Sequence, residues 1–97
     1  MNVLKWLEDW YSKKCNGDWE HTFGLQINTI DNPGWSISID IKETSLEGLQ
    51  IPYACFENSE DDWYCYKVEN DKYDAFGDAS KLEFLLLNFR KIVESKR

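Results

Sequence analysis

The sequence predicts an α+β fold: a four-stranded antiparallel sheet made of two hairpins, with N- and C-terminal helices packed on one face. Apolar residues recur every three or four positions at both ends of the chain, which is the period of an amphipathic helix. Between the ends, apolar and polar residues alternate, as in strands with one buried face. In the order helix, hairpin, hairpin, helix, a two-layer packing buries every apolar stripe.

The first element is a helix expected over residues 2–15. Its apolar stripe comprises Val3, Leu7, Trp10 and Tyr11, with Leu4 and Trp6 at the margins. Lys13 and Lys14 fall in the last turn, where positive charge suits the helix dipole. The Asn-Gly pair at 16–17 supplies a stop signal.

A first hairpin is expected from residues 23–28 and 35–42, which alternate on either side of "DNPGW" at 31–35. Pro33 presets φ for the second position of a turn, and Gly34 accepts the positive φ of the third. This is a type II pattern, and Asp31 or Asn32 can cap it with a side-chain hydrogen bond. Turn chemistry explains every residue of the pentapeptide, which favours a structural role over a binding role.

A second hairpin is expected from "YACFEN" at 53–58 and "WYCYKVEN" at 63–70, which flank the charged tip "SEDD". A symmetric loop places Cys55 nearly opposite Cys65. Aromatic residues occur at both odd and even positions of these strands, so the sequence does not show which face of this hairpin is buried. Residues 44–52 form a connection whose shape the sequence does not define.

The last element is a helix with an apolar stripe of about three and a half turns. The stripe consists of Leu82, Leu85, Leu86, Phe89, Ile92 and Val93. Asp78 or Ser80 can cap its start, and Ser80 with Glu83 matches a capping box. The basic C-terminal tail suits the end of a helix.

Length and charge limit the classes of function. The 97 residues are expected to form one domain, 1–97, large enough to fold without a metal or a disulfide. The net charge is −7, and residues 57–78 alone carry eight acidic and two basic side chains. Such a surface repels nucleic acid and anionic lipid and attracts basic partners. Direct nucleic-acid and membrane binding are therefore not expected.

The cysteines and the single histidine suggest little chemistry. Cys15, Cys55 and Cys65 form no CxxC pair, and the chain shows neither a signal peptide nor a membrane span. We therefore expect a cytoplasmic protein with reduced thiols. His21 lacks the companions of a zinc site, so no metal or cofactor is expected. A thiol enzyme using Cys15 or Cys55 with His21 remains an alternative, although small buried residues explain these cysteines more simply.

Four segments carry a family resemblance: "WLEDWY" at 6–11, "GDWEH" at 17–21 after Cys15, "INTIDNPGWSISIDI" at 27–41 and "GDASKL" before the last helix. Together they resemble the immunity protein 53 family of bacterial polymorphic toxin systems. "GDWEH" and "DNPGW" at this separation are specific as a pair. The resemblance runs from residue 4 to about 90 and implies a cytoplasmic antidote that binds and neutralises a cognate toxin domain. Residues that match the family pattern are Trp19, Glu20, Asp31, Pro33, Gly34, Trp35 and Asp40.

The site prediction combines this resemblance with charge. An acidic inhibitor suits the basic active site of a nuclease, and a Trp among charges is typical of an interface anchor. The residues expected to contact the toxin are Glu60, Asp61, Asp62, Trp63, Asp71 and Asp74. Glu20 and Asp40, with the family-pattern residues Trp19, Asp31 and Trp35, form a second-choice patch. No catalytic residue is expected, and a small-ligand module built on exposed tryptophans is a further alternative. The sequence does not determine the oligomeric state.

Overall fold

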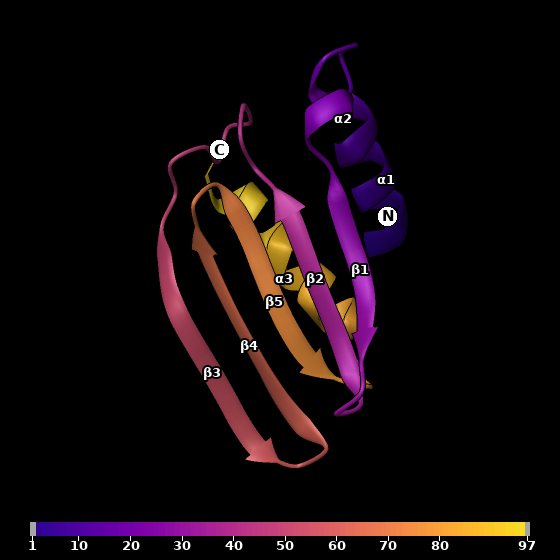
Figure 1. The fold of residues 1–97 in the computed structure, drawn as a ribbon, viewed down its shortest axis with the longest axis vertical. Coiled ribbons are helices and arrows are strands. Elements are labelled where there is room, and N and C mark those ends of the chain that lie inside the picture. Colours follow the sequence, from indigo (N-terminus) through magenta and orange to yellow (C-terminus); the bar gives the residue numbers. More distant parts are fainter. Residues whose placement is uncertain (1, 97) are drawn as a thin grey trace.

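The computed structural model describes residues 2–96 and shows two layers, an antiparallel sheet and a layer of helices behind it (Figure 1). The helices are α1 (Val3–Lys14), α2 (Trp19–Thr22) and α3 (Leu82–Ser95). The strands are β1 (Leu25–Ile30), β2 (Gly34–Asp40), β3 (Ile51–Ser59), β4 (Asp62–Glu69) and β5 (Lys72–Asp78). Both long helices lie on one face of the sheet, as predicted, and the other face stays open.

The N-terminal helix lies within one residue of the prediction at each end. Asn2 caps α1, because its side-chain oxygen accepts the Lys5 N–H at 2.9 Å. Val3, Leu7 and Trp10 are buried, as the stripe requires. The short helix α2, at a segment that the sequence did not assign to a helix, follows directly.

The C-terminal helix buries its predicted stripe, but its predicted cap is wrong. Leu85, Leu86, Phe89 and Ile92 are buried. The N-cap position is Lys81, and no side chain caps the first turn. The Ser80 hydroxyl instead donates to Asp78 at 2.6 Å, because that carboxylate organises the turn before α3.

The sheet has five strands, in the order β1-β2-β5-β4-β3, so the four-stranded prediction is corrected. β5 lies between the two predicted hairpins and pairs antiparallel with β2 and β4. Its core-facing residues, Tyr73, Ala75 and Gly77, give a weak apolar signal because two of them are small. They are small where α3 comes close: a Cβ on Gly77 would lie 2.8 Å from the Cβ of Lys81.

The turn between β4 and β5 is the local signal that the sequence analysis missed. Asn70 and Asp71 both have positive φ, 53° and 59°. Two consecutive residues of this conformation define the type I′ turn that joins two antiparallel strands tightly, and Asn and Asp tolerate it. This turn brings β5 back along β4.

The first hairpin forms with the expected strands, but its turn is not of type II. Ile30 pairs with Gly34, which leaves a three-residue loop, and the Asn32–Pro33 peptide bond is cis. Gly34 does not have a positive φ. Glycine is required at position 34 because of β5: a Cβ there would overlap the carbonyl oxygen of Gly77.

The second hairpin is β3–β4, and the structure settles which side of it faces the helices. Tyr64 contacts Phe84 of α3 at 4.5 Å between ring centroids, and Val68 is buried. Cys55 and Cys65, directly opposite in the register, point to the open face and form a disulfide. The expectation of small, buried, reduced cysteines is therefore wrong for this pair, because the strand register places the two residues directly opposite each other on the open face.

No helix in the part of the chain that the structure describes is long and apolar enough to cross a membrane.

Candidate functional site

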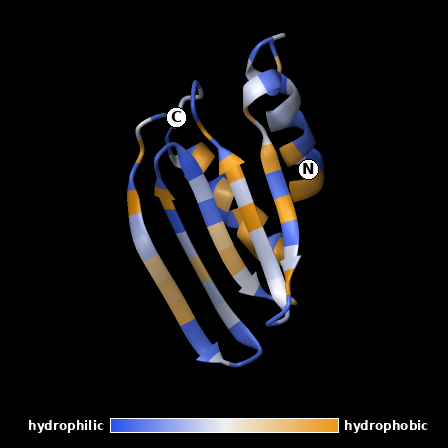
Figure 2. Ribbon diagram, in the orientation of Figure 1, coloured by the Kyte–Doolittle hydropathy of each residue, from blue (hydrophilic) through white to orange (hydrophobic). Residues whose placement is uncertain are grey.

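The open face of the sheet carries the candidate site. Residues alternate in hydropathy along β1 and β2 (Figure 2). Successive side chains of a strand point to opposite faces, so those that point away from the helices form a surface of their own. We call its part over β3, β4 and β5 the open strip: Tyr53, Cys55, Glu57, Trp63, Cys65, Lys67, Asp74 and Phe76. It combines three aromatic rings and the disulfide with charged side chains on each of the three strands.

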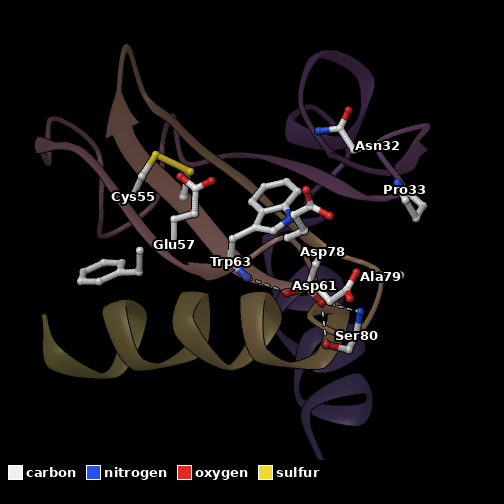
Figure 3. A pocket seen from close by; sticks show the side chains of 12 residues that line it. Asn32, Pro33, Cys55, Glu57, Asp61, Trp63, Asp78, Ala79 and Ser80 are labelled. Carbon is white, nitrogen blue, oxygen red and sulfur yellow. Dashed lines mark hydrogen bonds between the residues drawn. A yellow bond between two sulfur atoms is a disulfide. The ribbon is translucent and has the colours of Figure 1, made fainter.

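A cavity of about 760 Å³ lies at the end of the open strip next to the β3–β4 turn. Trp63 and the disulfide line it together with the acidic side chains of Glu57, Glu60 and Asp61. Figure 3 shows the Trp63 indole between Cys55 and Glu57 on one side and Asn32 and Pro33 on the other. We call this the acid–aromatic cavity.

Asp78, at the end of β5, holds the start of β4 against the turn before α3. Only 3% of its surface is exposed, and its carboxylate accepts the backbone N–H groups of Trp63 and Ser80, both at 2.8 Å. Lys81 donates to it at 2.7 Å. Burial raises the pKa of Asp78, but hydrogen bonds from Lys81, Ser80 and Trp63 outweigh burial and hold it well below its usual range. Asp78 is thus charged and fixes the backbone that carries Trp63.

Lys81 also determines which carboxylates near the cavity are free. It donates to Asp62 at 2.7 Å, and this hydrogen bond lowers the pKa of Asp62. Within residues 2–96, the side chains of Glu57, Glu60 and Asp61 have no hydrogen bond or ion pair. The acid–aromatic cavity therefore presents three uncompensated carboxylates beside a half-buried indole.

A second hollow, of about 550 Å³, continues the open strip toward the other end of the sheet. Tyr53, Phe76 and Asp74 line it with an ion pair formed by Lys67 and Glu69. Tyr53 is 59% exposed, which is high for so large a ring. Exposed rings surrounded by charges have the composition of an interface core with a polar rim.

The structure brings some of the predicted contact residues together and separates others. Glu60, Asp61 and Trp63 line the acid–aromatic cavity, and Asp74 lines the second hollow. Asp62 lies nearby, paired with Lys81 as described above. Asp71 lies at the β4–β5 turn, at the opposite end of the sheet, where it accepts the Gly48 N–H at 2.8 Å (Figure 1).

Sequence reasoning missed Glu57, Phe76 and the disulfide. Glu57 faces Trp63 across the hairpin, and Cys65 pairs in register with Phe76. The period-two pattern of the hairpin already places positions 53, 55 and 57 on the same face as positions 63 and 65, so Glu57 could have been found. Phe76 could not, because β5, which completes this surface, was not predicted.

Two of the family-pattern residues hold the α1–β1 connection in place. Trp19 is 2% exposed, and its indole N–H donates to the Lys42 carbonyl at 2.8 Å. Glu20 accepts the backbone N–H groups of Asn16 and Gly17, both at 2.9 Å. These contacts give both Trp19 and Glu20 a structural role in the connection.

The remaining family-pattern residues lie on β2 and its turn. The Trp35 indole donates to the Ala79 carbonyl at 3.0 Å. Asp40 accepts the Gly24 N–H at 3.0 Å and an ion pair from Lys72 at 2.9 Å. Asp31 is exposed in the turn. Of the second-choice patch, Asp31 is thus the residue with an exposed side chain and no described partner.

Across the described residues, no hydrogen bond joins Cys15 or Cys55 to His21, the pair that the alternative thiol site needs. Cys55 is in the disulfide and offers no thiolate, while the Cys15 thiol donates to the Tyr11 carbonyl at 3.3 Å. None of the five tryptophans is exposed, so the predicted platform of exposed indoles is wrong. Among residues 2–96, no group of three or more His, Cys, Asp or Glu side chains is placed to hold a metal ion.

An acidic face with aromatic rings set among charged side chains has the composition of a protein-binding surface. The model of one family, immunity protein 53, matches residues 4–94, and the chain belongs to that family. Membership implies an immunity protein of a toxin system, which binds a cognate toxin. No curated protein and no solved structure shows significant similarity to the chain.

Proposed function

We propose that this immunity protein neutralises its toxin by placing the open strip over a basic active-site surface, and that the toxin is a nuclease. The observation that supports this most directly is the acid–aromatic cavity, where Glu57, Glu60 and Asp61 stand uncompensated around Trp63. A nuclease must present basic groups to hold phosphate. An inhibitor with carboxylates in a hollow offers those groups an alternative partner.

The cavity supplies both parts of a strong contact. A lysine or arginine side chain from the toxin gains a cation–π contact from the indole of Trp63 and charge-assisted hydrogen bonds from the carboxylates. Tyr53 and Phe76 extend the apolar part of the surface toward the second hollow. A few such anchors carry most of the affinity of an interface, and they act mainly on the rate of dissociation.

The net charge acts on the rate of association. At −7, the chain attracts a basic toxin over distances of about a Debye length, roughly 8–10 Å at physiological salt. Such steering raises the association rate and falls with ionic strength. Asp74 and Asp71 contribute to this field even where they do not contact the toxin.

The proposed place of action is the cytoplasm, where a nuclease meets its substrate. Disulfides are rare in a reducing cytosol. In the structure Cys55 and Cys65 are joined by a disulfide, so the proposed place of action requires the open strip to bind its toxin also when this bond is reduced. The cavity is still formed by the strand register that places them opposite each other.

The decisive experiment is co-expression of the chain with the toxin encoded beside its gene, followed by purification of the complex. Three forms are compared: the wild type, Glu60→Gln/Asp61→Asn/Trp63→Ala, and Glu83→Gln/Asp18→Asn. The last pair is a matched control, because both carboxylates are exposed and have no partner among the described contacts. Circular dichroism checks that each form folds.

We expect the wild type and the control to restore growth and to co-purify with the toxin. The cavity variant should bind at least about 100-fold more weakly, as is typical when a central anchor and its charges are removed. Its association rate should also depend less on salt. Equal binding by the cavity variant would place the interface elsewhere, and failure of the wild type to bind would reject the toxin-inhibitor function for this pair.

A further inference from the structure

The two edges of the sheet differ in how they are protected. β3 contains Pro52 and the charged Glu57, and its pairing with β4 is irregular at two places. Proline, charge and bulges are the usual devices that prevent an edge strand from pairing with another chain. β1, the opposite edge, reads LQINTI, pairs with β2 in unbroken register, and has none of these devices.

The backbone of β1 offers a regular set of hydrogen-bonding groups on its outer side. The backbone N–H of Asp40 donates to the Gly24 carbonyl at 2.9 Å, and the Gly24 N–H donates to the Asp40 carboxylate at 3.0 Å, so the backbone groups of Gly24 face β2. Along an antiparallel ladder, residues whose backbone groups face the neighbouring strand alternate with residues whose groups face outward. The N–H and C=O groups of Leu25, Ile27 and Thr29 therefore point outward from the sheet, where residues 2–96 provide no strand to receive them.

Apolar side chains gather beside this edge. Leu4 is 57% exposed, Tyr11 38% and Ile27 37%. Between α1 and the start of β1 lies a largely apolar hollow of about 400 Å³, lined by Leu4, Leu7, Tyr11, Gly24 and Leu25 together with the acidic Glu8. In Figure 1 the arrowhead of β1 extends past α1, so the helix does not cover the second half of the strand.

We propose that β1 is an interface between two copies of this chain, which pair antiparallel about a two-fold axis at Ile27 and join their sheets. In this register Ile27 faces Ile27 of the second copy, and Leu25 faces Thr29. Every outward N–H and C=O of the three residues then has a partner. A strand whose outward groups are centred on one residue is self-complementary, as a two-fold interface requires.

Charge favours a second copy at this edge over any other part of the surface. The chain carries a net charge of −7, so two copies repel each other wherever acidic side chains meet. None of the six residues of β1 is charged. Asn28 meets Gln26 of the second copy on the other face of the joined strands, where the two side-chain amides can hydrogen-bond to each other. The acidic open strip lies at the far side of the sheet and stays free for the toxin.

The test is sedimentation equilibrium of the purified full chain over about 1 µM to 1 mM. The variants are Ile27→Lys and, at the matched control position, Leu87→Lys, which is 44% exposed on α3. Two lysines opposite each other replace an apolar pair, so Ile27→Lys should weaken the dimer by about tenfold or more. Leu87→Lys should not change it. Thr29→Lys repeats the test if Ile27→Lys fails to fold.

Concentration-dependent protection of the Leu25, Ile27 and Thr29 amides from hydrogen exchange should accompany dimerisation. A wild type that stays monomeric throughout the range overturns the proposal. So does a dimer that Ile27→Lys and Thr29→Lys leave intact. If the chain alone is monomeric and Ile27→Lys blocks toxin binding instead, the edge receives a strand of the toxin and the second-copy proposal is wrong.

Discussion

Replacement of Asp78 by alanine tests whether one buried carboxylate holds β4, β5 and α3 together. The change removes the acceptor of four hydrogen bonds, two from Ser80 and one each from the Trp63 N–H and Lys81. It also leaves the Trp63 N–H without its partner. Because Trp63 stands in the acid–aromatic cavity, the loss should affect both stability and the proposed toxin surface.

The magnitude follows from these contacts. Hydrogen bonds to a charged group contribute about 1.5–3 kcal/mol each, but four bonds to one carboxylate are not additive. In this variant Lys81 keeps Asp62 as an ion-pair partner and is 15% exposed, so the Lys81 charge is not left buried without a partner. We therefore expect Asp78→Ala to lower the free energy of unfolding by about 3 kcal/mol, which is at the lower end of the range for breaking a buried ion pair. For a chain of this size that is a fall in Tm of about 15 °C.

Asp78 also makes the stability of the folded protein depend on pH, with stability falling as the pH falls. The pKa of Asp78 is lowered in the folded protein, so its contribution is fully present above the unfolded pKa of about 3.9 and is lost as the pH falls below it. Asp62, whose pKa is also lowered, adds to this acid-side loss. Asp78→Asn should be less stable than the wild type at pH 7, and its stability should change less on acidification.

Urea unfolding monitored by tryptophan fluorescence at pH 7 and pH 3 measures both effects. Asp61→Asn is the matched control, since its carboxylate is exposed and unpaired, and it should cost less than about 0.5 kcal/mol. A loss below about 1 kcal/mol for Asp78→Ala at pH 7 would refute the reasoning. So would equal acid sensitivity of the wild type and Asp78→Asn.

Two further changes test the packing of the sheet. Gly34→Ala should destabilise the protein by about 2–3 kcal/mol in urea unfolding, because its Cβ meets the Gly77 carbonyl, whereas Gly24→Ala, with open space around its Cβ, should be nearly neutral. Equal effects of the two would reject the close approach of β2 and β5. Reduction of the disulfide should lower the free energy of unfolding by about 2–3 kcal/mol, the entropy of a loop whose ends are 10 residues apart, and Cys15→Ser should not reproduce this loss. An unchanged unfolding midpoint in dithiothreitol would contradict it.

The elements that depend on local periodicity could be predicted from the sequence. The stripes of α1 and α3 are dense enough to define a helix and its buried side without any partner. The two hairpins follow from alternation and from turn residues between the strands. The acidic tip beside Trp63 was predicted as a contact site from the family resemblance, its charge and the tryptophan among the charges, and it remains a prediction.

Other features depend on contacts between segments distant in the chain. β5 is recognisable only as the partner of β2 and β4, because its small core-facing residues fit the space left by α3. Gly34 looked like a turn residue, yet its constraint comes from Gly77, 43 positions later. Asp78 looked like a helix cap, but it accepts hydrogen bonds from the Trp63 N–H and from Lys81 instead.

The sequence by itself determined the two helices, the two hairpins and the excess of negative charge, because these depend on composition and on neighbours within a few residues. Only the tertiary structure decided which carboxylates are free. Lys81 neutralises Asp62 and Asp78, and strand pairing brings Glu57 beside Trp63. Whether an acidic side chain can meet a partner depends on where the nearest cation lies in space, and that position is set by packing rather than by order along the chain.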